Sequence, residues 1–406
     1  MNSSSPKGQT VKTSHLVRGL ALLLLAGASA DLLAAHPNCG VSGGTLLRWP
    51  ATGPAIWEMC WLPPNQSSGV QGSGLEVRDV HYKGILVAKR FHSPILFAEY
   101  RGGAGGNCYR DWKDANARFA ATPATRNTLG VPGAFFATTT CDVSTSATAS
   151  HGLCPFNNLS PNPFVTADCL NSGVSIEDRT NAANPEESFV MLTTQYSASW
   201  YQYVSRFAFY ANGDINPEFG YGNSDGTYNN VTHWHHNYWR LDFDIDGAAH
   251  DQIAANGELK STEFTDVRSL TGAGGQPSYW EVTDGVSGFG YRVNSGAGDY
   301  TPANESGRGF HLADVIGSRF INNEYADKAN NNLNDCQMVA TNIANGENIV
   351  DSDVVLYYTA SVRDSTANNW PTSGSGAIPQ DSMVCKKVGP LITPVGDWPI
   401  FRDDFQ

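Results

Sequence analysis

The sequence predicts a mostly β protein, built as a large antiparallel β-sandwich with few short helices. Two observations support this class. Short runs of alternating apolar and polar residues recur along the chain and end at turn residues, which is the pattern of sandwiches and barrels. In addition, glycine, asparagine, serine and threonine are abundant, and no long, clean amphipathic helical stretch occurs.

Two clear strand signals occur before residue 214. Residues 75–82 alternate and stop at Lys83-Gly84. Residues 207–210 lead into Asn212-Gly213, and an Asn-Gly pair favours a tight hairpin turn. Both segments are therefore expected to be strands that end in turns.

Two more signals follow later in the chain. Residues 238–245 alternate and end at Asp246-Gly247, while residues 354–358 form a nearly continuous apolar run typical of a buried strand. The Cys- and Pro-rich segment 139–171 interrupts this pattern between residues 82 and 207, and it predicts a long surface loop pinned by disulfides. We expect this loop to lie within one domain and not to mark a boundary.

Residues 1–30 have the three parts of a secretory signal: a positively charged start, an apolar run at 20–26 and small residues at 28–30. Cleavage is predicted before Asp31, which leaves residues 31–406 as a single domain. The apolar run is too short to span a bilayer, and no later segment is long enough. The protein is therefore expected to be secreted, in an extracellular or periplasmic location.

Net charge narrows the class of partner. The signal holds three basic residues and no acidic one, so its removal changes the formal net charge from −13 to −16. Nucleic-acid binding depends on basic contacts, so no nucleic-acid partner is expected. An acidic protein can instead attract cationic substrates such as amines.

All eight cysteines follow the signal, and none forms a CxxC pair. An even number of cysteines in an exported chain predicts four disulfides and no free thiol. The sequence leaves their connectivity open. The cysteines are Cys39, Cys60, Cys108, Cys141, Cys154, Cys169, Cys336 and Cys385.

The densest cluster of chemically active side chains lies at residues 232–240. His233 and His235 are two residues apart, so in a strand their side chains point to one face, where two imidazoles can bind one metal ion. His236 would point to the other face. A third ligand must come from elsewhere in the chain, and an aromatic–histidine cluster without a metal is the alternative.

Residues 233–247, which run from H-x-H through Arg-Leu-Asp to an acidic alternation closed by glycine, resemble the copper-binding hairpin of copper amine oxidases. Residues 200–213 are similar to the segment that bears this family's self-generated cofactor, topaquinone. The order of the matches is preserved over about residues 75–371. Further matching segments are residues 79–84, 319–325, 353–359 and 370–371.

This resemblance implies the same sandwich fold and the oxidative deamination of a primary amine by dioxygen, which yields aldehyde, peroxide and ammonia. It implies copper at His233 and His235, and it implies that Tyr201 is the precursor of topaquinone. The family's third copper ligand is a downstream histidine. Counting forward from Asp353 places that position at Asp364, whereas counting back from Trp370 places it at Arg363.

The sequence departs from the family pattern at three points, each of which affects catalysis. Tyr201 lies between Trp200 and Gln202, not between asparagine and an acidic residue, so an ordinary packed tyrosine is the alternative. The third ligand position holds no histidine. No D-x-G-E segment that would carry the catalytic base is found; the nearest stretch is residues 108–114, where Asp114 is the better candidate and Asp111 the weaker one.

The residue at the third ligand position determines whether the site binds a metal ion and which ion it prefers. With Asp364, the site has two histidines and one carboxylate, a set that also suits iron(II) or zinc. With Arg363, a fixed positive charge would oppose a dication and the metal site would be lost.

A second ion site is implied by the same resemblance. In the family, two aspartates of the hairpin join a later aspartate and its neighbour's carbonyl around a calcium-like ion, and these positions match Asp242, Asp244, Asp353 and Val354. Residues 242–247 also resemble the opening of an EF-hand loop, but the closing position holds isoleucine, which excludes that motif. Solvated edge carboxylates are the alternative.

Three functions therefore stay open from the sequence. The first is a copper amine oxidase-like enzyme that uses a small primary amine and dioxygen and forms a homodimer, as the family does. The second is a non-catalytic descendant that acts as a binding or structural protein. The third is a metalloenzyme with two histidines and one carboxylate on the same scaffold.

Overall fold

The structure is a computed structural model of the whole chain. It describes residues 36–62, 66–68, 75–100, 108–110, 174–179, 181, 183–198, 201–223, 233–269, 276–296, 299, 313–321, 343–364 and 386–398. At some of these positions, Tyr201, His233, Arg363 and Asp364 among them, only the backbone is described. The predicted signal at 1–30, the loop at 139–171 and Asp114 lie outside the described residues.

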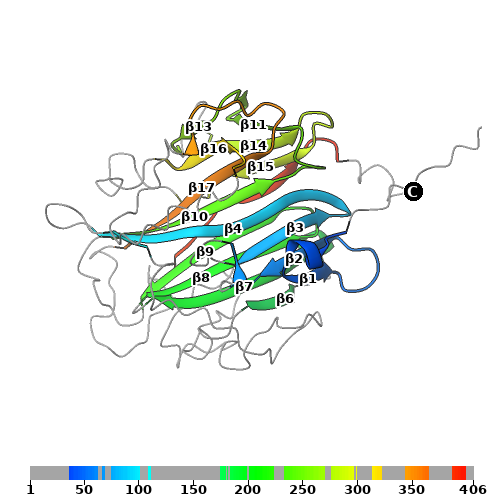
Figure 1. The fold of residues 1–406 in the computed structure, drawn as a ribbon. Coiled ribbons are helices and arrows are strands. Elements are labelled where there is room, and N and C mark those ends of the chain that lie inside the picture. The colour runs from blue at the N-terminus through cyan, green and yellow to red at the C-terminus, as the bar shows by residue number, and fades with distance from the viewer. Residues whose placement is uncertain are drawn as a thin grey trace, which may run out of the picture. The chain divides into compact units, whose positions relative to one another are not determined.

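The described strands form two sheets (Figure 1), and every recorded pair of strands is antiparallel. The first sheet has nine strands. Its order is β1 (Thr45–Trp49), β2 (Trp57–Leu62), β3 (Glu76–Tyr82), β4 (Ile85–Tyr100), β10 (His233–Phe243), β17 (Val354–Asp364), β16 (Val315–Arg319) and β13 (Phe264–Asp266), with β5 (Cys108–Arg110) paired to β4.

The second sheet has ten strands, also counted over the described ranges. Its order is β12 (Glu258–Leu259), β11 (Asp251–Ala255), β14 (Tyr279–Asp284), β15 (Gly290–Asn294), β19 (Leu391–Val395), β9 (Ile215–Asn223), β8 (Tyr201–Tyr210), β7 (Phe189–Ala198) and β6 (Val174–Arg179), with β18 (Lys386–Val388) paired to β9.

Helix is nearly absent from the part of the chain that the structure describes. It consists of α1 (Cys39–Ser42) and one 3-10 turn, η5 (Pro185–Glu187). No helix among these residues has the length and apolar character needed to cross a membrane. The prediction of a mostly β fold with few short helices is confirmed.

A single hydrophobic core joins the facing sheets. The ring of Phe207 on β8 lies 5.1 Å from that of Trp239 on β10, and Phe209 lies 5.1 Å from Trp57 on β2. All four side chains belong to one buried cluster. Because apolar side chains of both sheets interdigitate, the architecture is the predicted β-sandwich.

The strands predicted from alternation are present. Residues 75–82 form β3, and Lys83-Gly84 make the turn into β4. Residues 207–210 end β8, and the Asn-Gly turn leads into β9. The segment at 354–358 opens the buried strand β17.

The segment at 238–245 belongs to a longer strand. Strand β10 begins at His233, because its pairing with β17 continues without a shift from Phe243 back to that residue. The predicted histidine pair therefore lies within the same strand as the acidic alternation.

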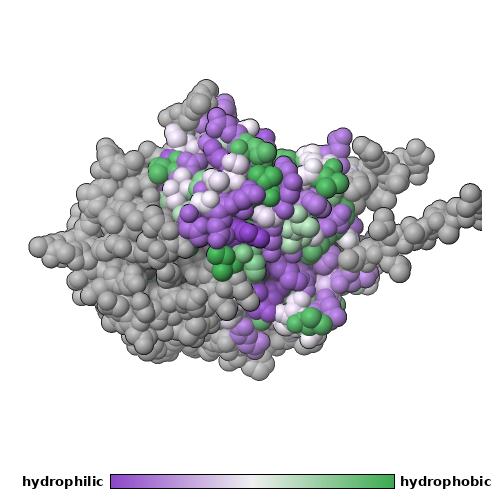
Figure 2. All heavy atoms as spheres, turned by 45° about the horizontal axis from the view of Figure 1, so that its top comes forward, coloured by the Kyte–Doolittle hydropathy of each residue, from purple (hydrophilic) through white to green (hydrophobic). Residues whose placement is uncertain are grey.

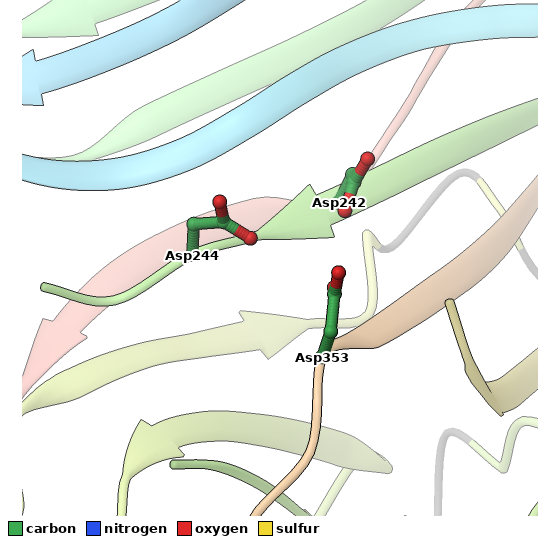
Figure 3. Close-up of side chains that lie close together, drawn as sticks. All are labelled: Asp242, Asp244 and Asp353. Carbon is green, nitrogen blue, oxygen red and sulfur yellow. The ribbon is translucent and has the colours of Figure 1, made fainter. Parts of the chain in front are cut away.

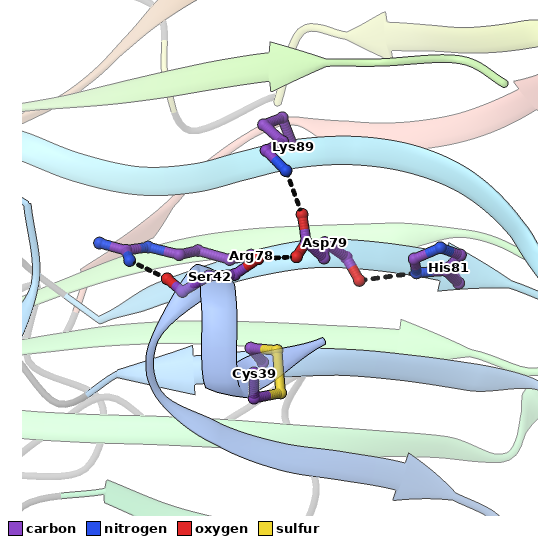
Figure 4. Close-up of a disulfide and its surroundings, with 7 residues drawn as sticks. Cys39, Ser42, Arg78, Asp79, His81 and Lys89 are labelled. Carbon is purple, nitrogen blue, oxygen red and sulfur yellow. Dashed lines mark hydrogen bonds and ion pairs between the residues drawn. A yellow bond between two sulfur atoms is a disulfide. The ribbon is translucent and has the colours of Figure 1, made fainter. Parts of the chain in front are cut away.

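One disulfide, Cys39–Cys60, is formed among the described cysteines, and it ties α1 to β2. Polar contacts also attach α1 to β3 (Figure 4). Ser42 donates its hydroxyl to Asp79 on β3, whose other carboxylate oxygen lies 2.6 Å from the ammonium of Lys89 on β4. The disulfide is consistent with an oxidising compartment. For the remaining six cysteines, the predicted pairing concerns side chains outside the described set.

The face drawn in Figure 2 carries hydrophilic and hydrophobic residues side by side, without a broad apolar patch among the coloured residues. The large exposed apolar side chains that the structure describes are spread over the sequence, from Val41 to Leu391. Isolated residues of this kind are normal on protein surfaces.

Candidate functional site in the β-sandwich

Strand β10 presents alternate residues to two environments. Trp239 and Leu241 pack in the core between the sheets, whereas Tyr238 belongs to a separate cluster on the outer face. By the same alternation, the positions of His233 and His235 lie on the inner face. His235 is fully buried, and His236 points outward, where its Nδ1 lies 2.8 Å from the Ser361 hydroxyl.

The pairing of β10 with β17 identifies the residue that stands opposite the histidines. His233 is paired with Asp364, and Trp234 is paired with Arg363. Directly opposed residues of an antiparallel pair share a face of the sheet. Asp364 therefore occupies a position on the inner face beside His233, and Arg363 occupies one on the outer face.

Strand β8 runs in the same direction as β10 on the facing sheet. Its middle contacts the middle of β10 through Phe207 and Trp239. Its end contacts Tyr82, whose hydroxyl donates to the Ala211 carbonyl at 3.1 Å. Through β3 and β4, Tyr82 lies beyond the Phe243 end of β10.

Because β8 and β10 run in the same direction, the position of Tyr201 along the strands can be compared with that of His233. Tyr201 precedes Phe207 by six residues, just as His233 precedes Trp239 by six, so both lie about 20 Å from the contact at a strand rise of about 3.3 Å per residue. Alternation also puts Tyr201 on the same face of β8 as Phe207, which is the inner face. The backbone thus brings the positions of Tyr201 and the histidine pair to one end of the intersheet space.

A cluster of carboxylates lies at the opposite end of β10. One oxygen from each of Asp242, Asp244 and Asp353 lies within 4.8 Å of the others (Figure 3). Asp242 and Asp244 are 1% and 7% exposed, so the alternative of solvated edge carboxylates is wrong for this pair. Val354, the fourth predicted member, is the fully buried first residue of β17.

Burial and mutual repulsion disfavour the charged forms of this cluster. Desolvation, then the neighbouring Asp242, raises the pKa of Asp244 to about 8 and that of Asp353 to about 7. Asp242 has a hydrogen-bonded basic partner, Arg240, whose Nη1 donates to its Oδ2 at 2.7 Å. Lys89 acts to lower the pKa of Asp244, and Arg240 and Arg319 act to lower that of Asp353, but burial and the charge of Asp242 outweigh them.

The cluster fits a cation. The Oδ1 atoms of Asp242, Asp244 and Asp353 are buried and accept no hydrogen bond from the described residues. Hard oxygen ligands of this kind suit calcium, which would neutralise the repulsion that otherwise forces protonation. The donor set thus agrees with the calcium-like ion implied by the sequence.

The sequence analysis missed one member of this region. Asp251, the first residue of β11, is fully buried, and its Oδ1 accepts the Ile245 N–H at 3.4 Å. Burial, then the charge of Asp244, raises its pKa to about 9. Its closeness to Asp244 depends on how the chain folds back after β10, which no local pattern signals.

No family model matches the chain, and no curated protein does. Solved structures do. A copper-containing benzylamine oxidase from Hansenula polymorpha matches with a TM-score of 0.52 and 11% identity over 95% of this chain and 63% of its own. The lysyl oxidase of Pichia pastoris matches with a TM-score of 0.54 and 12% identity over 84% and 51%.

An amine oxidase from Aspergillus nidulans matches with a TM-score of 0.50 and 15% identity, over 85% of this chain and 51% of its own. The chain thus spans between half and two thirds of the length of these enzymes. At such low identity the matches establish architecture and not chemistry. The chain has the fold of the copper amine oxidases and is a divergent example of it.

Proposed function

We propose that this chain is a secreted, copper amine oxidase-like enzyme that deaminates primary amines oxidatively with dioxygen. The observation that carries the proposal is the strand register: His233 is paired with Asp364, and Tyr201 lies at the same level on the facing strand β8. A possible metal ligand set and a candidate tyrosine thus converge at one end of the sandwich. The fold shared with solved amine oxidases supports the same assignment.

His233, His235 and Asp364 would hold the metal. Two imidazoles and a carboxylate fit a first-row transition metal, and imidazole suits copper well. Bound copper would supply the redox chemistry for converting a tyrosine to topaquinone and for reaction with dioxygen. The carboxylate makes this set less selective for copper than three histidines would be.

The protein's own residues would set the environment of the reaction. The inner face of β10 excludes water around His235, whereas His236 lies on the opposite face, where it contacts the Ser361 hydroxyl. Tyr201 would be the precursor of the quinone, which would supply the carbonyl chemistry for the amine. Asp114 is proposed to accept the α-proton of the substrate.

The deciding experiment measures metal and quinone on the same purified protein. Copper-loaded protein exposed to air should contain about one copper per chain and give a positive redox-cycling quinone stain. Tyr201→Phe should abolish the stain and leave copper bound, whereas Tyr203→Phe, at the next position on the same face of β8, should keep both. Stoichiometric copper without a stain would refute the quinone.

Substitution of the third ligand tests the metal site separately. Asp364→Ala should weaken copper binding at least tenfold. Asp364→His, which restores three imidazoles, should bind copper at least as tightly as the natural chain. Equal binding by the natural chain and the alanine variant would remove Asp364 from the site.

The carboxylate at position 364 also favours a second candidate, an enzyme that uses iron(II) or zinc at the same three residues without a quinone. This reading predicts tighter retention of iron(II) or zinc than of copper after purification, together with a negative stain. A chain that retains no transition metal would instead be a non-catalytic binding or structural protein.

We further propose that Asp242, Asp244, Asp353 and the carbonyl of Val354 bind calcium in a structural role. The buried, unpaired oxygens described above support this role. We also propose a homodimer, by analogy with the family that shares the fold.

A further inference from the structure

Several buried hydrogen-bond donors in the intersheet core lack a protein acceptor within the described ranges, those of Trp61 and Tyr291 among them. Three of these donors come from inward-facing positions of β8 and β10 close to the contact between the two strands: the amide nitrogen of Asn237, the indole nitrogen of Trp239 and the hydroxyl of Ser205. Each residue is fully buried. Buried polar groups are usually hydrogen-bonded, so three unsatisfied donors in one region need an explanation.

Asn237 lies on the inner face of β10, two residues after His235. Its Oδ1 accepts the Ser93 hydroxyl at 2.5 Å, which leaves the Nδ2 group to donate. The residues opposite it on the neighbouring strands are Leu96 and Ala360, whose side chains are apolar and cannot accept a hydrogen bond. The amide donor therefore faces an apolar layer.

Ser205 lies on the facing strand. It precedes Phe207 by two residues, and Asn237 precedes Trp239 by two, while Phe207 and Trp239 are in contact. Because β8 and β10 run in the same direction, Ser205 and Asn237 lie at one level, across the gap of about 10 Å that separates packed sheets. Trp239 occupies the next inward-facing position of β10 after Asn237.

All three groups can donate a hydrogen bond. The Asn237 carbonyl is already used, so this region offers an amide N–H, an indole N–H and a hydroxyl, all of which can donate. The complement of such a set is a compact group with several acceptor atoms, and a carboxylate has about four acceptor positions on two oxygens. Apolar neighbours would strengthen these hydrogen bonds by excluding water.

We propose that this space binds a small carboxylate, held by Asn237, Trp239 and Ser205 between β8 and β10. The site begins at Asn237, two residues after His235 along β10. It is separate from the proposed metal ligands and from the acidic cluster at the other end of that strand. It does not depend on amine oxidation. The carboxylate comes from a free small anion or from the substrate itself.

Binding can be measured on the full chain after chelation of metals, so that carboxylate bound to a metal ion does not contribute. Sodium formate is titrated against sodium chloride at constant ionic strength, with calorimetry and melting temperature as readouts. We expect a saturable heat and a rise in melting temperature of at least about 2 °C with formate and not with chloride.

Asn237→Asp is the most informative variant, because it keeps an oxygen for Ser93 and replaces the donor by a like charge. It should weaken formate binding at least tenfold. Ser205→Ala removes one donor without adding charge and should weaken binding about threefold to tenfold, which keeps the test decisive if the first variant fails to fold. Asn348→Asp is the matched control, since Asn348 is exposed and its Oδ1 accepts the Val350 N–H at 3.0 Å.

Two results would overturn the site: no saturable formate binding by the natural chain, or equal binding by Asn237→Asp and the natural chain. A competition experiment identifies the source of the carboxylate. If formate competes with an amine that carries a carboxylate and not with one that lacks it, the site binds the carboxylate of the substrate. If formate competes with neither amine, the site binds a free anion. Formate binding without amine oxidation would refute the proposed function and leave this site intact.

Discussion

Asp244 illustrates how one buried carboxylate can act in opposite ways with and without a cation. It is 7% exposed, lies beside Asp242 and Asp353, and its Oδ1 accepts no hydrogen bond among the described residues. Asp244→Asn removes a charge that is costly when calcium is absent and useful when it is bound. We expect the substitution to weaken calcium binding at least tenfold, measured by calorimetry.

The matched control is Asp246→Asn, because Asp246 is exposed and lies two residues away. It adopts a positive φ of 56°, which asparagine tolerates. Calcium should raise the melting temperature of this control as it does that of the natural chain. An unchanged calcium affinity in Asp244→Asn would exclude Asp244 as a ligand.

The raised pKa values of the cluster predict how stability changes with pH. With pKa values of about 8 for Asp244 and about 7 for Asp353, the calcium-free folded protein keeps protons that the unfolded chain releases near pH 4. Its stability is therefore greatest below about pH 4 on account of these groups, and this contribution is lost as the pH rises through about 7 to 8.

Denaturant unfolding in a calcium chelator, at several pH values between 5 and 9, measures this effect. The free energy of unfolding should fall with rising pH, and saturating calcium should reduce or reverse the fall because it favours the ionised carboxylates. A chelated protein whose stability increases steadily over this range would contradict the assignment.

At the scale of elements, the turn between β8 and β9 controls the strand that carries Tyr201. Gly213 has a φ of +96°, and a Cβ atom there would lie 2.8 Å from Pro394 Cγ and 3.0 Å from the ring of Tyr82. Gly213→Ala therefore adds a steric clash to backbone strain. We expect a loss of about 2–3 kcal/mol in the free energy of unfolding.

Gly247→Ala separates these two costs. Gly247 also has a positive φ, of +115°, but a Cβ atom there would meet nothing within 4 Å. This control should lose only about 1 kcal/mol, the cost of the strained backbone. Equal losses in the two variants, measured by denaturant unfolding, would show that the packing of the turn against Tyr82 and Pro394 contributes nothing.

At the scale of the whole molecule, disulfides are expected to stabilise the folded chain. Cys39 and Cys60 are 21 residues apart and join α1 to β2. Replacing both with alanine should cost about 3 kcal/mol of stability, chiefly because the unfolded chain gains freedom. Denaturant unfolding of the variant against the natural chain measures this loss.

The remaining cysteines extend the prediction to the full chain. All eight follow the predicted signal, so thiol titration of the denatured mature protein should find no free thiol. Two or more free thiols would contradict the complete pairing. The Cys39→Ala/Cys60→Ala variant should also show none, because it removes both partners of one bridge.

The sequence by itself determined the class of fold. Alternation with period two and turn residues predicted β3, the end of β8 and the second half of β10, and a continuous apolar run predicted the opening of β17, because side-chain pattern and turn chemistry are local properties. The order of motifs indicated the amine oxidase fold that solved structures then matched. The H-x-H spacing likewise put the two histidines on one face of a strand.

Tertiary structure alone decided which distant residues meet. Counting along the chain left Asp364 and Arg363 as equal candidates, and only the pairing of β17 with β10 set Asp364 opposite His233. Burial of Asp242 and the closeness of Asp251 to Asp244 also depend on how separate strands pack. The physical reason is that register and burial arise from hydrogen bonds and contacts between separate strands, in the case of β10 and β17 more than a hundred residues apart, which no local pattern encodes.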